Sequence, residues 1–541
     1  MTSGAASASV ARSVLDAVAV HGATTVFGLP GVHNLAFWKN VPQAPLVVRH
    51  EQAAVYAADG WARATGRLGA AVVTTGPGAA NALAAFGEAA SVGSPVLLVA
   101  SEIPQTLRRD GRLRGVLHES RDQAGMFAPL AKAVFTPRTA EEVAESLDGA
   151  IACAMTHPRG PVYMDVPADV LGHDAVPLRP GRGAVWHEME PADSDLDAAA
   201  AVLADARVVI WAGGGAVDVE PSLAVLAEHL GAPVVTSYQG RGCPPTGHPV
   251  AVGLPPHEPE VAALIGAADV LLAVGGDLDG MNTRNWTMPR PPELVTLEPA
   301  LRRDVPEWPA DVAVTGTLGS AMRGLRDRLP ARPAWAPPGL RGQVLARIAA
   351  DPATAEAIAL VEAVEAARDS ADDAVLVCDM AVAGYWVGGY ATVPGPRRVA
   401  YPVGWGTLGF GLPAAIGAAA AGHPVIAVCG DGGLAMGLGE LATLVQERLP
   451  VTVLVVDDGG YGMLRYDQVR AGDAEVGVDL TTPDFVALAT AFGLPATNVP
   501  SVGVGLEKAL IAAVASGGPH LVRVPALLTP PRTTSPRWHE D

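Results

Sequence analysis

Short apolar, β-branched runs alternate with longer stretches rich in Ala and Leu along the whole chain. The run VVRH leads into EQAAVYAADGWARATG, and VIAVCG is followed by LGELATLVQERL and then by VTVLVV. Strands buried on both faces of a parallel sheet read as continuous apolar runs, and the helices between them read as longer amphipathic segments. The pattern therefore predicts an α/β fold in which helices cover both faces of parallel sheets.

Two Pro-rich, irregular segments, at about 171–195 and about 328–345, interrupt this alternation. Because proline cannot continue a helix or donate a hydrogen bond in a central strand, we expect linkers there. A chain of 541 residues is also too long for a single hydrophobic core. We therefore predict three doubly wound parallel-sheet domains, at residues 1–172, 192–328 and 346–541.

Charge and cysteine content exclude several classes of function. The formal net charge of −19 would repel nucleic acid and acidic membrane surfaces. Cys153, Cys243, Cys378 and Cys429 are far apart and form no CxxC pair, so neither a disulfide framework nor a zinc site is indicated. The sequence shows no signal peptide and no apolar stretch of about 18 residues. We expect a cytoplasmic protein with no nucleic-acid and no membrane partner.

Two acidic turns follow two apolar runs in the third predicted domain. Residues 425–429 lead into Gly-Asp-Gly-Gly with Asp431, and residues 451–456 lead into Asp-Asp-Gly-Gly with Asp458; we expect one helix between them. Open α/β sheets bind ligands at the carboxyl ends of their strands, where glycines let backbone N–H groups approach phosphate. A helix beginning near Tyr461 would point its positive end at the same anion. Magnesium prefers such oxygen ligands, so the two turns predict a phosphate and magnesium site.

Near the N-terminus, Glu51 stands where the strand-like segment PLVVRH meets a helical segment. An acid in the first turn of a helix is favoured electrostatically whatever its function. The residue alone is therefore compatible with a purely structural role.

The segment GDGGLAMGLGELATLVQERLPVTVLVVDDGGYG resembles the diphosphate-binding motif of thiamine diphosphate enzymes, which opens with GDG and normally closes with Asn-Asn. Here the close is Asp457-Asp458, which keeps the ligating oxygen and adds negative charge. The resemblance implies Mg²⁺ bound by Asp431, Asp458 and the carbonyl of Gly460. It also implies diphosphate contacts from Gly432, Gly433, Tyr461 and Gly462.

The segment RHEQAAVYAADGWARATG resembles the part of acetolactate synthase-type enzymes that carries their essential glutamate. Glu51 would then hold an acid proton against the pyrimidine ring of the cofactor. FGLPGVHN and TTGPGAAN resemble the glycine turns that line the pyrimidine and substrate side, and GWGTLGFGLPAAIG resembles the segment that holds the cofactor bent. The contacts implied by these segments are Pro30, Gly31, Thr75, Gly76 and Asn81, the carbonyl of Gly406, and Leu408 beneath the two rings.

The same resemblance assigns the three domains to pyrimidine binding, a central structural role and diphosphate binding. In the resembling families the first and third domains meet across a subunit interface, which implies a homodimer or homotetramer. In the central domain, VVIWAGGGAV has Asp218 where a dinucleotide fingerprint needs its third glycine. VGGDLDGMN and GLPPHEPE lack the Arg and Gly-Met-His-Gly cues with which acetohydroxy acid synthases bind FAD, so we expect no FAD.

Two further segments, GRLRGVLHESRDQAGMF and YGMLRYDQVRAGDAEVGVDLTTPDF, resemble most the guanidino-oxo-acid decarboxylases. They imply decarboxylation of a 2-oxo acid to an enamine, followed by release of an aldehyde. Where synthases carry a substrate-binding lysine this chain has Ala168, and their Gln-His-Gln is Val382-Ala383-Gly384. These differences argue against acetolactate synthesis, while transfer to another carbonyl acceptor and a non-catalytic paralogue stay open.

Proton transfer and substrate contact have several candidate residues. His33 in the first glycine turn, His118 and the adjacent Glu119 are candidates for acid–base chemistry, although histidines also occur as packed or surface residues. Met463, Leu464 and Tyr466 follow the metal turn and are candidates for the substrate pocket, with ordinary core packing as the alternative.

Overall fold

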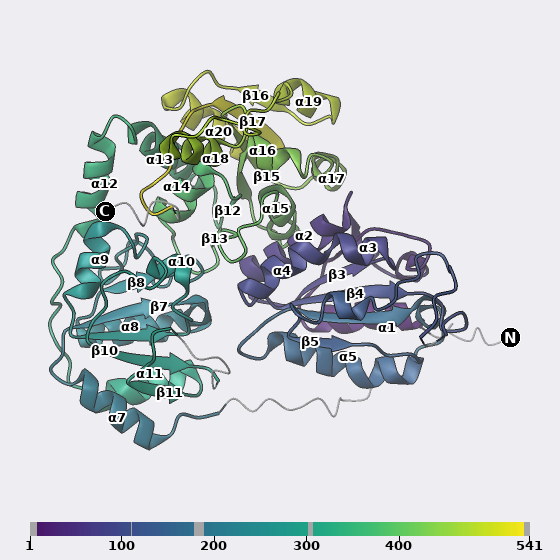
Figure 1. Cartoon of the computed structure of the whole chain (residues 1–541), viewed down its shortest axis with the longest axis horizontal. Coiled ribbons are helices and arrows are strands. Elements are labelled where there is room, and N and C mark those ends of the chain that lie inside the picture. Colours follow the sequence, from purple (N-terminus) through teal and green to yellow (C-terminus); the bar gives the residue numbers. More distant parts are fainter. Residues whose placement is uncertain (1–7, 110, 178–188, 301–306, 535–541) are drawn as a thin grey trace.

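The structure is a computed structural model that describes residues 8–109, 111–177, 189–300 and 307–534. It contains three sheets, and every pair of neighbouring strands in them is parallel. Helices cover both faces of each sheet, so the predicted α/β class with three parallel-sheet domains is confirmed (Figure 1). Part of the linker expected at about 171–195 lies outside the described residues, and the exact domain limits stay predictions.

The first sheet has the strand order β2-β1-β3-β4-β6-β5. Its strands are β1 (Val26–Gly28), β2 (Leu46–Val47), β3 (Gly69–Val73), β4 (Val96–Glu102), β5 (Ala133–Phe135) and β6 (Val162–Pro167). Its helices are α1 (Val10–Val20), η1 (Leu35–Trp38), α2 (Glu51–Thr65), α3 (Pro77–Asn81), α4 (Leu83–Ser91), η2 (Ala124–Met126), α5 (Ala140–Met155) and α6 (Ala168–Leu171). The central strands β3, β4 and β6 are buried along their whole length, as their apolar sequences require.

The central sheet has the order β11-β10-β9-β7-β8. Its strands are β7 (Val208–Ala212), β8 (Val234–Thr236), β9 (Val270–Val274), β10 (Glu293–Glu298) and β11 (Val312–Thr315). Its helices are α7 (Asp193–Leu203), η3 (Gly214–Val219), α8 (Glu220–Leu230), α9 (Pro259–Gly266), α10 (Gly280–Thr283) and α11 (Leu318–Arg328). The Pro-rich segment after α11 contains no helix or strand before residue 340, but a helix begins at Leu340, so the linker is shorter than the predicted 328–345.

The third sheet has the order β13-β12-β14-β15-β17-β16. Its strands are β12 (Val375–Cys378), β13 (Val399–Ala400), β14 (Val425–Gly430), β15 (Val451–Asp457), β16 (Ala496–Asn498) and β17 (His520–Pro525). Its helices are α12 (Leu340–Ala350), α13 (Ala355–Asp369), α14 (Val382–Tyr390), α15 (Gly411–Ala420), α16 (Asp431–Ala435), α17 (Glu440–Glu447), α18 (Gly462–Ala471), α19 (Phe485–Ala491) and α20 (Val504–Ala515). The expectation of one helix between β14 and β15 was wrong. Two helices lie there, because the Gly-rich residues 436–439 interrupt the helical path.

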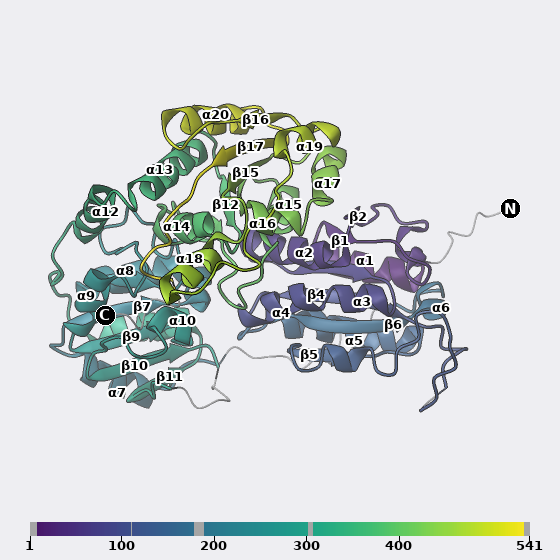
Figure 2. The ribbon, with the colours of Figure 1, turned by 45° about the horizontal axis from the view of Figure 1, so that its top comes forward.

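The first and third domains share one continuous hydrophobic core, built around the contact between α2 and α15 (Figure 2). Glycines bring the two helix backbones unusually close. A Cβ atom on Gly60 would lie 2.0 Å from the carbonyl oxygen of Ala414, and one on Gly417 would lie 1.9 Å from that of Ala57. The contact therefore fixes where α2, which begins at Glu51, lies relative to the third sheet.

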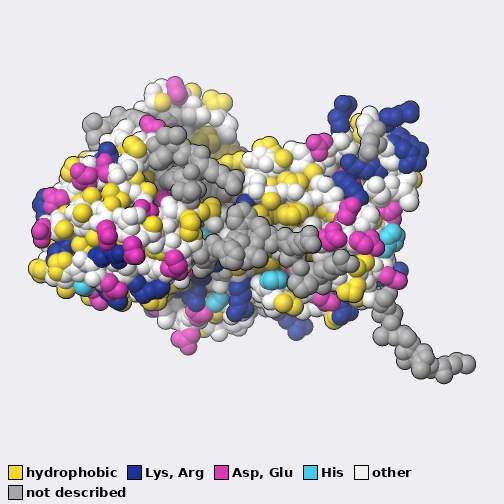
Figure 3. All heavy atoms as spheres, turned by 90° about the horizontal axis from the view of Figure 1, so that it is seen from below, with side chains coloured by type: hydrophobic (Ala, Val, Ile, Leu, Met, Phe, Trp, Pro, Cys, Tyr) yellow, Lys and Arg dark blue, Asp and Glu magenta, His cyan; other side chains and the backbone are white. Residues whose placement is uncertain are grey.

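The cysteines, the helices and the surface charge can be compared with what the composition predicted. All four cysteines are free and buried. In the described residues, no helix is both long enough and apolar enough to cross a membrane. On the face seen in Figure 3, acidic and basic side chains are interspersed with apolar ones, and Lys and Arg gather at one end. On this face, the basic side chains are thus unevenly distributed.

Candidate active site

Asp431 and Asp458 lie side by side at the carboxyl edge of the third sheet. Asp431 directly follows β14, Asp458 directly follows β15, and these strands are neighbours with Gly430 paired to Val456. Asp431 is only 2% exposed, and Asp458 is partly buried. Its Oδ1 atom and the Oδ2 atom of Asp431 are both buried without a hydrogen-bond partner. The sequence prediction that these two carboxylates meet at one sheet edge is therefore supported by their placement.

Electrostatics at this edge favour a bound cation. Burial, followed by the charge of Asp458, raises the pKa of Asp431 to about 7. Burial also raises the pKa of Asp458, against the opposing charge of Arg465. Two buried carboxylates that repel each other and leave oxygens unpaired fit a divalent ion with hard oxygen ligands. In the described parts of the chain no three His, Cys, Asp or Glu side chains are arranged to hold a metal, so further ligands would be main-chain or cofactor oxygens.

The turn after β15 is shaped by glycines and held by one arginine. A Cβ atom on Gly462 would lie 1.9 Å from Oδ2 of Asp458, and one on Gly460 would lie 2.0 Å from the carbonyl oxygen of Val478. Arg465 donates to the carbonyl oxygens of Asp458, at 3.1 Å, and of Gly459, at 3.3 Å. These two carbonyls are thus engaged within the turn, and the carbonyl of Gly460 stays the main-chain ligand that the resemblance implies.

The diphosphate contacts predicted from the sequence surround the same edge. A Cβ atom on Gly432 would lie 2.8 Å from the Tyr461 ring, and one on Gly433 would lie 2.8 Å from Oδ2 of Asp379. Helix α18 begins at Gly462 with Tyr461 as its N-terminal flanking residue, within one position of the predicted start. Backbone N–H groups at this edge can therefore approach an anion closely, and a helix N-terminus lies beside them.

Glu51 is the first residue of α2 and is 7% exposed. Its Oε2 atom accepts a 3.0 Å hydrogen bond from the side-chain amide of Asn81, at the end of α3. A Cβ atom on Gly78, in α3, would lie 2.6 Å from Cγ2 of Thr74 and 3.1 Å from Oε1 of Glu51, so the helix backbone approaches both side chains closely. The fold thus brings together two predicted site residues that are 30 positions apart.

The turn at Gly76 is fixed by a residue that the sequence did not reveal. Gly76 has φ +67°, and its N–H donates a 2.6 Å hydrogen bond to Oε1 of Gln123, which is 1% exposed. Gln123 in turn donates to the hydroxyl oxygen of Tyr163, at 3.0 Å. Thr75, the neighbouring predicted contact, shares a 2.8 Å hydrogen bond with Ser101. Gln123 lies in a segment already singled out, but nothing in its local pattern marks it as a partner of Gly76.

His33 and His118 form an edge-to-face pair with ring centroids 5.3 Å apart. Both Nδ1 atoms are buried and lack a hydrogen-bond partner. Burial, and secondly the charge of His118, lowers the pKa of His33. The backbone oxygen of His118 would lie 2.6 Å from a Cβ atom on Gly76, so the pair stands beside that turn. Neither of these ring nitrogens is therefore engaged by a hydrogen bond within the described part of the chain.

Two further predicted residues, Gly31 and Glu119, make hydrogen bonds within their own loops. The N–H of Gly31, which follows the exposed Pro30, donates a 2.7 Å hydrogen bond to Oδ1 of Asn34. Oε2 of Glu119 accepts hydrogen bonds from the backbone N–H of Arg114, at 2.7 Å, and of a second residue in the same loop. Those bonds lower the pKa of Glu119. Its side chain therefore shapes its own loop.

The segment that carries Gly406 and Leu408 is anchored by two buried acids. Asp379, at the end of β12, accepts hydrogen bonds from the N–H groups of Met380, at 2.8 Å, and Gly409, at 3.0 Å. Burial raises its pKa to about 6. Gly406 has φ +72°, and Leu408 is partly buried. Asp379 thus joins this segment to the GDG turn, a role that its sequence context did not suggest.

The second anchor comes from the first domain. Glu88 on α4 is fully buried, and its Oε2 accepts a 3.1 Å hydrogen bond from the N–H of Trp405. Its Oε1 accepts from Arg63, which is also paired with Asp59 at 2.7 Å. These charges raise the pKa of Arg63. A buried ion network therefore ties helices α2 and α4 to the segment predicted to bend the cofactor.

The three predicted substrate contacts lie on the first turns of α18. Met463 packs against the core shared by the central and third domains. Leu464 is 53% exposed, and Tyr466 has the guanidinium of Arg470 5.7 Å from its ring centroid. Only Met463 is thus integrated into the core of a single chain.

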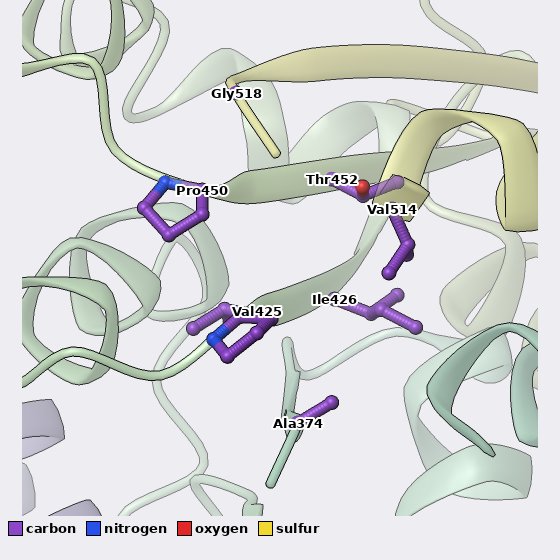
Figure 4. A pocket seen from close by; sticks show the side chains of 8 residues that line it. Ala374, Val425, Ile426, Pro450, Thr452, Val514 and Gly518 are labelled. Carbon is purple, nitrogen blue, oxygen red and sulfur yellow. The ribbon is translucent and has the colours of Figure 1, made fainter. Parts of the chain in front are cut away.

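A cavity at the opposite end of the third sheet is too small for a substrate. It lies among the amino-terminal residues of β14 and β15, with Val425, Ile426 and Thr452 in its lining (Figure 4). Its volume of about 10 Å³ corresponds to roughly one water molecule. This cavity therefore carries no candidate chemistry.

Comparison with known proteins agrees with this geometry. Residues 8–126 match the N-terminal TPP binding domain of thiamine pyrophosphate enzymes, 196–325 the central domain, and 379–524 the C-terminal TPP binding domain. A Pseudomonas aeruginosa protein named probable 2-ketoarginine decarboxylase AruI is 34% identical, covering 95% of this chain and 93% of its own. A Methanocaldococcus jannaschii protein named probable acetolactate synthase large subunit is 30% identical, covering 95% and 91%. The chain belongs to the thiamine pyrophosphate (thiamine diphosphate) enzymes and is a decarboxylase or carboligase of that family.

Proposed function

We propose that this enzyme binds thiamine diphosphate with Mg²⁺, decarboxylates a 2-oxo acid and releases an aldehyde. The observation that carries the metal is the pair of buried, unpaired carboxylate oxygens on Asp431 and Asp458 at neighbouring strand ends. A cation there would satisfy both oxygens and offset the repulsion that raises the pKa of Asp431. The carbonyl of Gly460 and the glycines of the two turns would complete the contacts with the ion and the diphosphate.

When bound, thiamine diphosphate supplies an electron sink for the carbanion that forms as the carboxyl group of the substrate leaves. Glu51 would hold a proton at its carboxyl group against the pyrimidine ring, with Asn81 fixing the orientation of that group. The Nδ1 atoms of His33 and His118 would exchange protons with the substrate or product. Leu408 would support the bent cofactor from below, and Met463, Leu464 and Tyr466 would line the substrate side.

Aldehyde release is favoured over acetolactate synthesis by the residues at the site edge. Val382 and Ala383 line a small cavity together with Asp458, at positions where synthases have Gln-His-Gln. Ala168, where synthases have lysine, begins α6. These apolar side chains offer no hydrogen bond or charge to a second substrate. The similarity to proteins named acetolactate synthase supports a carboligase with another acceptor as the second candidate.

We further propose that the enzyme works without FAD. In the segment that corresponds to the FAD-binding loop, His257 and Glu258 are buried and already engaged by the chain itself. His257 bonds to the carbonyl oxygen of Thr533 at 2.7 Å, and Glu258 accepts from Arg347 at 2.9 Å. A flavin would have to displace these partners.

We also propose a homodimer or homotetramer with the active site at the subunit interface. Large apolar side chains near the carboxyl edge of the third sheet are exposed in the single chain: Met436 is 57%, Leu464 is 53% and Trp405 is 52% exposed. Clustered exposed apolar residues are typical of protein contacts, and a second subunit would bury them.

The test is to incubate the purified enzyme, thiamine diphosphate and Mg²⁺ with a panel of 2-oxo acids, including a 5-guanidino compound, with and without added aldehydes. Carbon dioxide and an aldehyde in equal amounts, without acceptor, are expected. Formation of a hydroxy-ketone or hydroxy acid in place of the aldehyde would establish the carboligase. Absence of carbon dioxide with every acid would refute both.

A further inference from the structure

Asp457, the residue before the metal-turn aspartate, forms a partly buried ion pair with Arg523. The Oδ2 atom of Asp457 accepts hydrogen bonds from Nε of Arg523, at 2.9 Å, and from Nη2, at 2.6 Å. Asp457 is 8% exposed. The two residues come from the neighbouring strands β15 and β17, so the sheet itself holds them in register.

The pair lies at the point where this chain carries more negative charge than its motif normally has. Asp431, Asp457 and Asp458 all lie at the carboxyl ends of the neighbouring strands β14 and β15, so their carboxyl groups gather at one edge. A diphosphate group brought to this edge would meet the charge of Asp457 in addition to that of the metal ligands. A charge that an arginine does not offset would therefore oppose binding of the anion.

The same pair also shapes the turn. The other carboxylate oxygen of Asp457, Oδ1, accepts a 3.3 Å hydrogen bond from the N–H of Gly459. Arg523 donates to Oδ1 of Asn498 on β16 at 3.2 Å, which fixes the guanidinium from its far side. The carboxyl group of Asp457 thus has two defined partners, Arg523 and the N–H of Gly459, and it also lies close to the carboxyl group of Asp431.

We propose that Arg523 is a positioning residue for the cofactor's diphosphate, which neutralises Asp457 so that the Asp-Asp turn behaves toward the anion as a turn with one carboxylate ligand. The proposal rests on the proposed binding of Mg²⁺ and diphosphate at Asp431 and Asp458. Arg523 itself touches neither group. A purely structural ion pair would instead affect the stability of the sheet and leave the affinity for diphosphate unchanged.

The experiment compares the full-length wild type with Arg523→Gln, Asp457→Asn and the double variant, by calorimetric titration with inorganic diphosphate plus Mg²⁺. Arg523→Gln is expected to weaken binding about 10-fold or more, since it leaves a buried carboxylate unpaired beside the anion. Asp457→Asn in that background is expected to restore affinity to within about 3-fold of the wild type. Asp457→Asn alone is expected to bind at least as tightly as the wild type.

Controls separate charge from folding. Arg207→Gln removes an arginine that likewise donates from Nε and Nη2 to one aspartate, the exposed Asp269 in the central domain, and should leave diphosphate binding unchanged. Thiamine, which lacks phosphate, should bind the wild type and Arg523→Gln equally. Thermal melting of each variant reports its fold, and if Arg523→Gln does not fold, Arg523→Lys and Asp457→Asn carry the test.

Unchanged affinity in Arg523→Gln, a double variant as weak as that single variant, or a loss of about 10-fold in Asp457→Asn would each overturn the proposal. Failure of the underlying site looks different. In that case Asp431→Ala would bind diphosphate and Mg²⁺ as the wild type does, whatever the residues at 457 and 523.

Discussion

The side-chain amide of Asn81 donates a 3.0 Å hydrogen bond to Oε2 of Glu51, which joins the end of α3 to the start of α2. This hydrogen bond fixes one oxygen of the carboxyl group. The other oxygen, Oε1, lies next to Gly78 in α3. A carboxyl group that is buried, oriented and still able to make another hydrogen bond is suited to hold a proton against a bound ring.

Replacing Glu51 with Gln is expected to leave the fold intact and to lower kcat by about 10²-fold to 10⁴-fold, because the amide keeps the size of the side chain and removes its acidic proton. Steady-state decarboxylation and circular dichroism measure the two effects. Glu141→Gln, at an exposed position in the first turn of α5, is the matched control and should turn over normally. Full activity of Glu51→Gln would refute the role of Glu51.

Asp431→Ala is expected to abolish Mg²⁺-dependent retention of thiamine diphosphate, since it removes one of the two buried carboxylates that face the cation. Calorimetric titration with and without Mg²⁺ measures this loss. Asp351→Ala, at an exposed position after α12, should bind the cofactor as the wild type does. An Asp431→Ala protein that still binds thiamine diphosphate more tightly with Mg²⁺ would contradict the metal assignment.

Gly417→Ala is expected to destabilise the contact between the first and third domains by about 1–3 kcal/mol or more, because its Cβ would lie 1.9 Å from a backbone oxygen of α2. Denaturant unfolding of the cofactor-free protein measures the change. Gly342→Ala on α12 is the control: no atom lies within 4 Å of its added Cβ, so a neutral effect or a gain of up to about 1 kcal/mol is expected. If the two variants unfold with the same free energy, α2 and α15 can move apart without a cost in stability, which would contradict the close contact.

Asp379 is expected to make the cofactor-free protein less stable as the pH rises. Its pKa is raised from 3.8 to about 6 by burial, so the protonated form is favoured in the folded state. The associated stability is fully present below about pH 4 and is lost as the pH rises through 6, by on the order of 3 kcal/mol. Asn does not ionise, so the free energy of unfolding of Asp379→Asn lacks this pH dependence. Relative to the wild type, the variant should become more stable as the pH rises from 4 to 7. A difference that does not change with pH would contradict the burial argument.

The sequence predicted correctly which candidate residues lie at the end of a strand or at the start of a helix. Asp431, Asp458 and Glu51 are of this kind, because an apolar run followed by a glycine turn defines such a position locally. The break between α16 and α17 was missed, since the helical composition of the segment outweighed the glycines at 437 and 439 in the interpretation.

Other residues could not be found in this way. Gln123, Asp379 and Glu88 act on backbone groups that lie 47, 30 and 317 positions away. Such contacts depend on how sheets and domains pack, and no local spacing encodes them. A buried Glu in an Ala-rich helix is the only hint that Glu88 gave, since an ionised side chain is rarely fully buried unless it is paired.

A crystal structure with thiamine diphosphate and Mg²⁺ tests most directly whether the two remote acidic groups hold one cofactor. We expect the pyrimidine ring beside Glu51 of one subunit, and the diphosphate and Mg²⁺ on Asp431, Asp458 and the Gly460 carbonyl of the partner. A cofactor bound elsewhere, or in contact with only one of the two groups, would contradict the assignment.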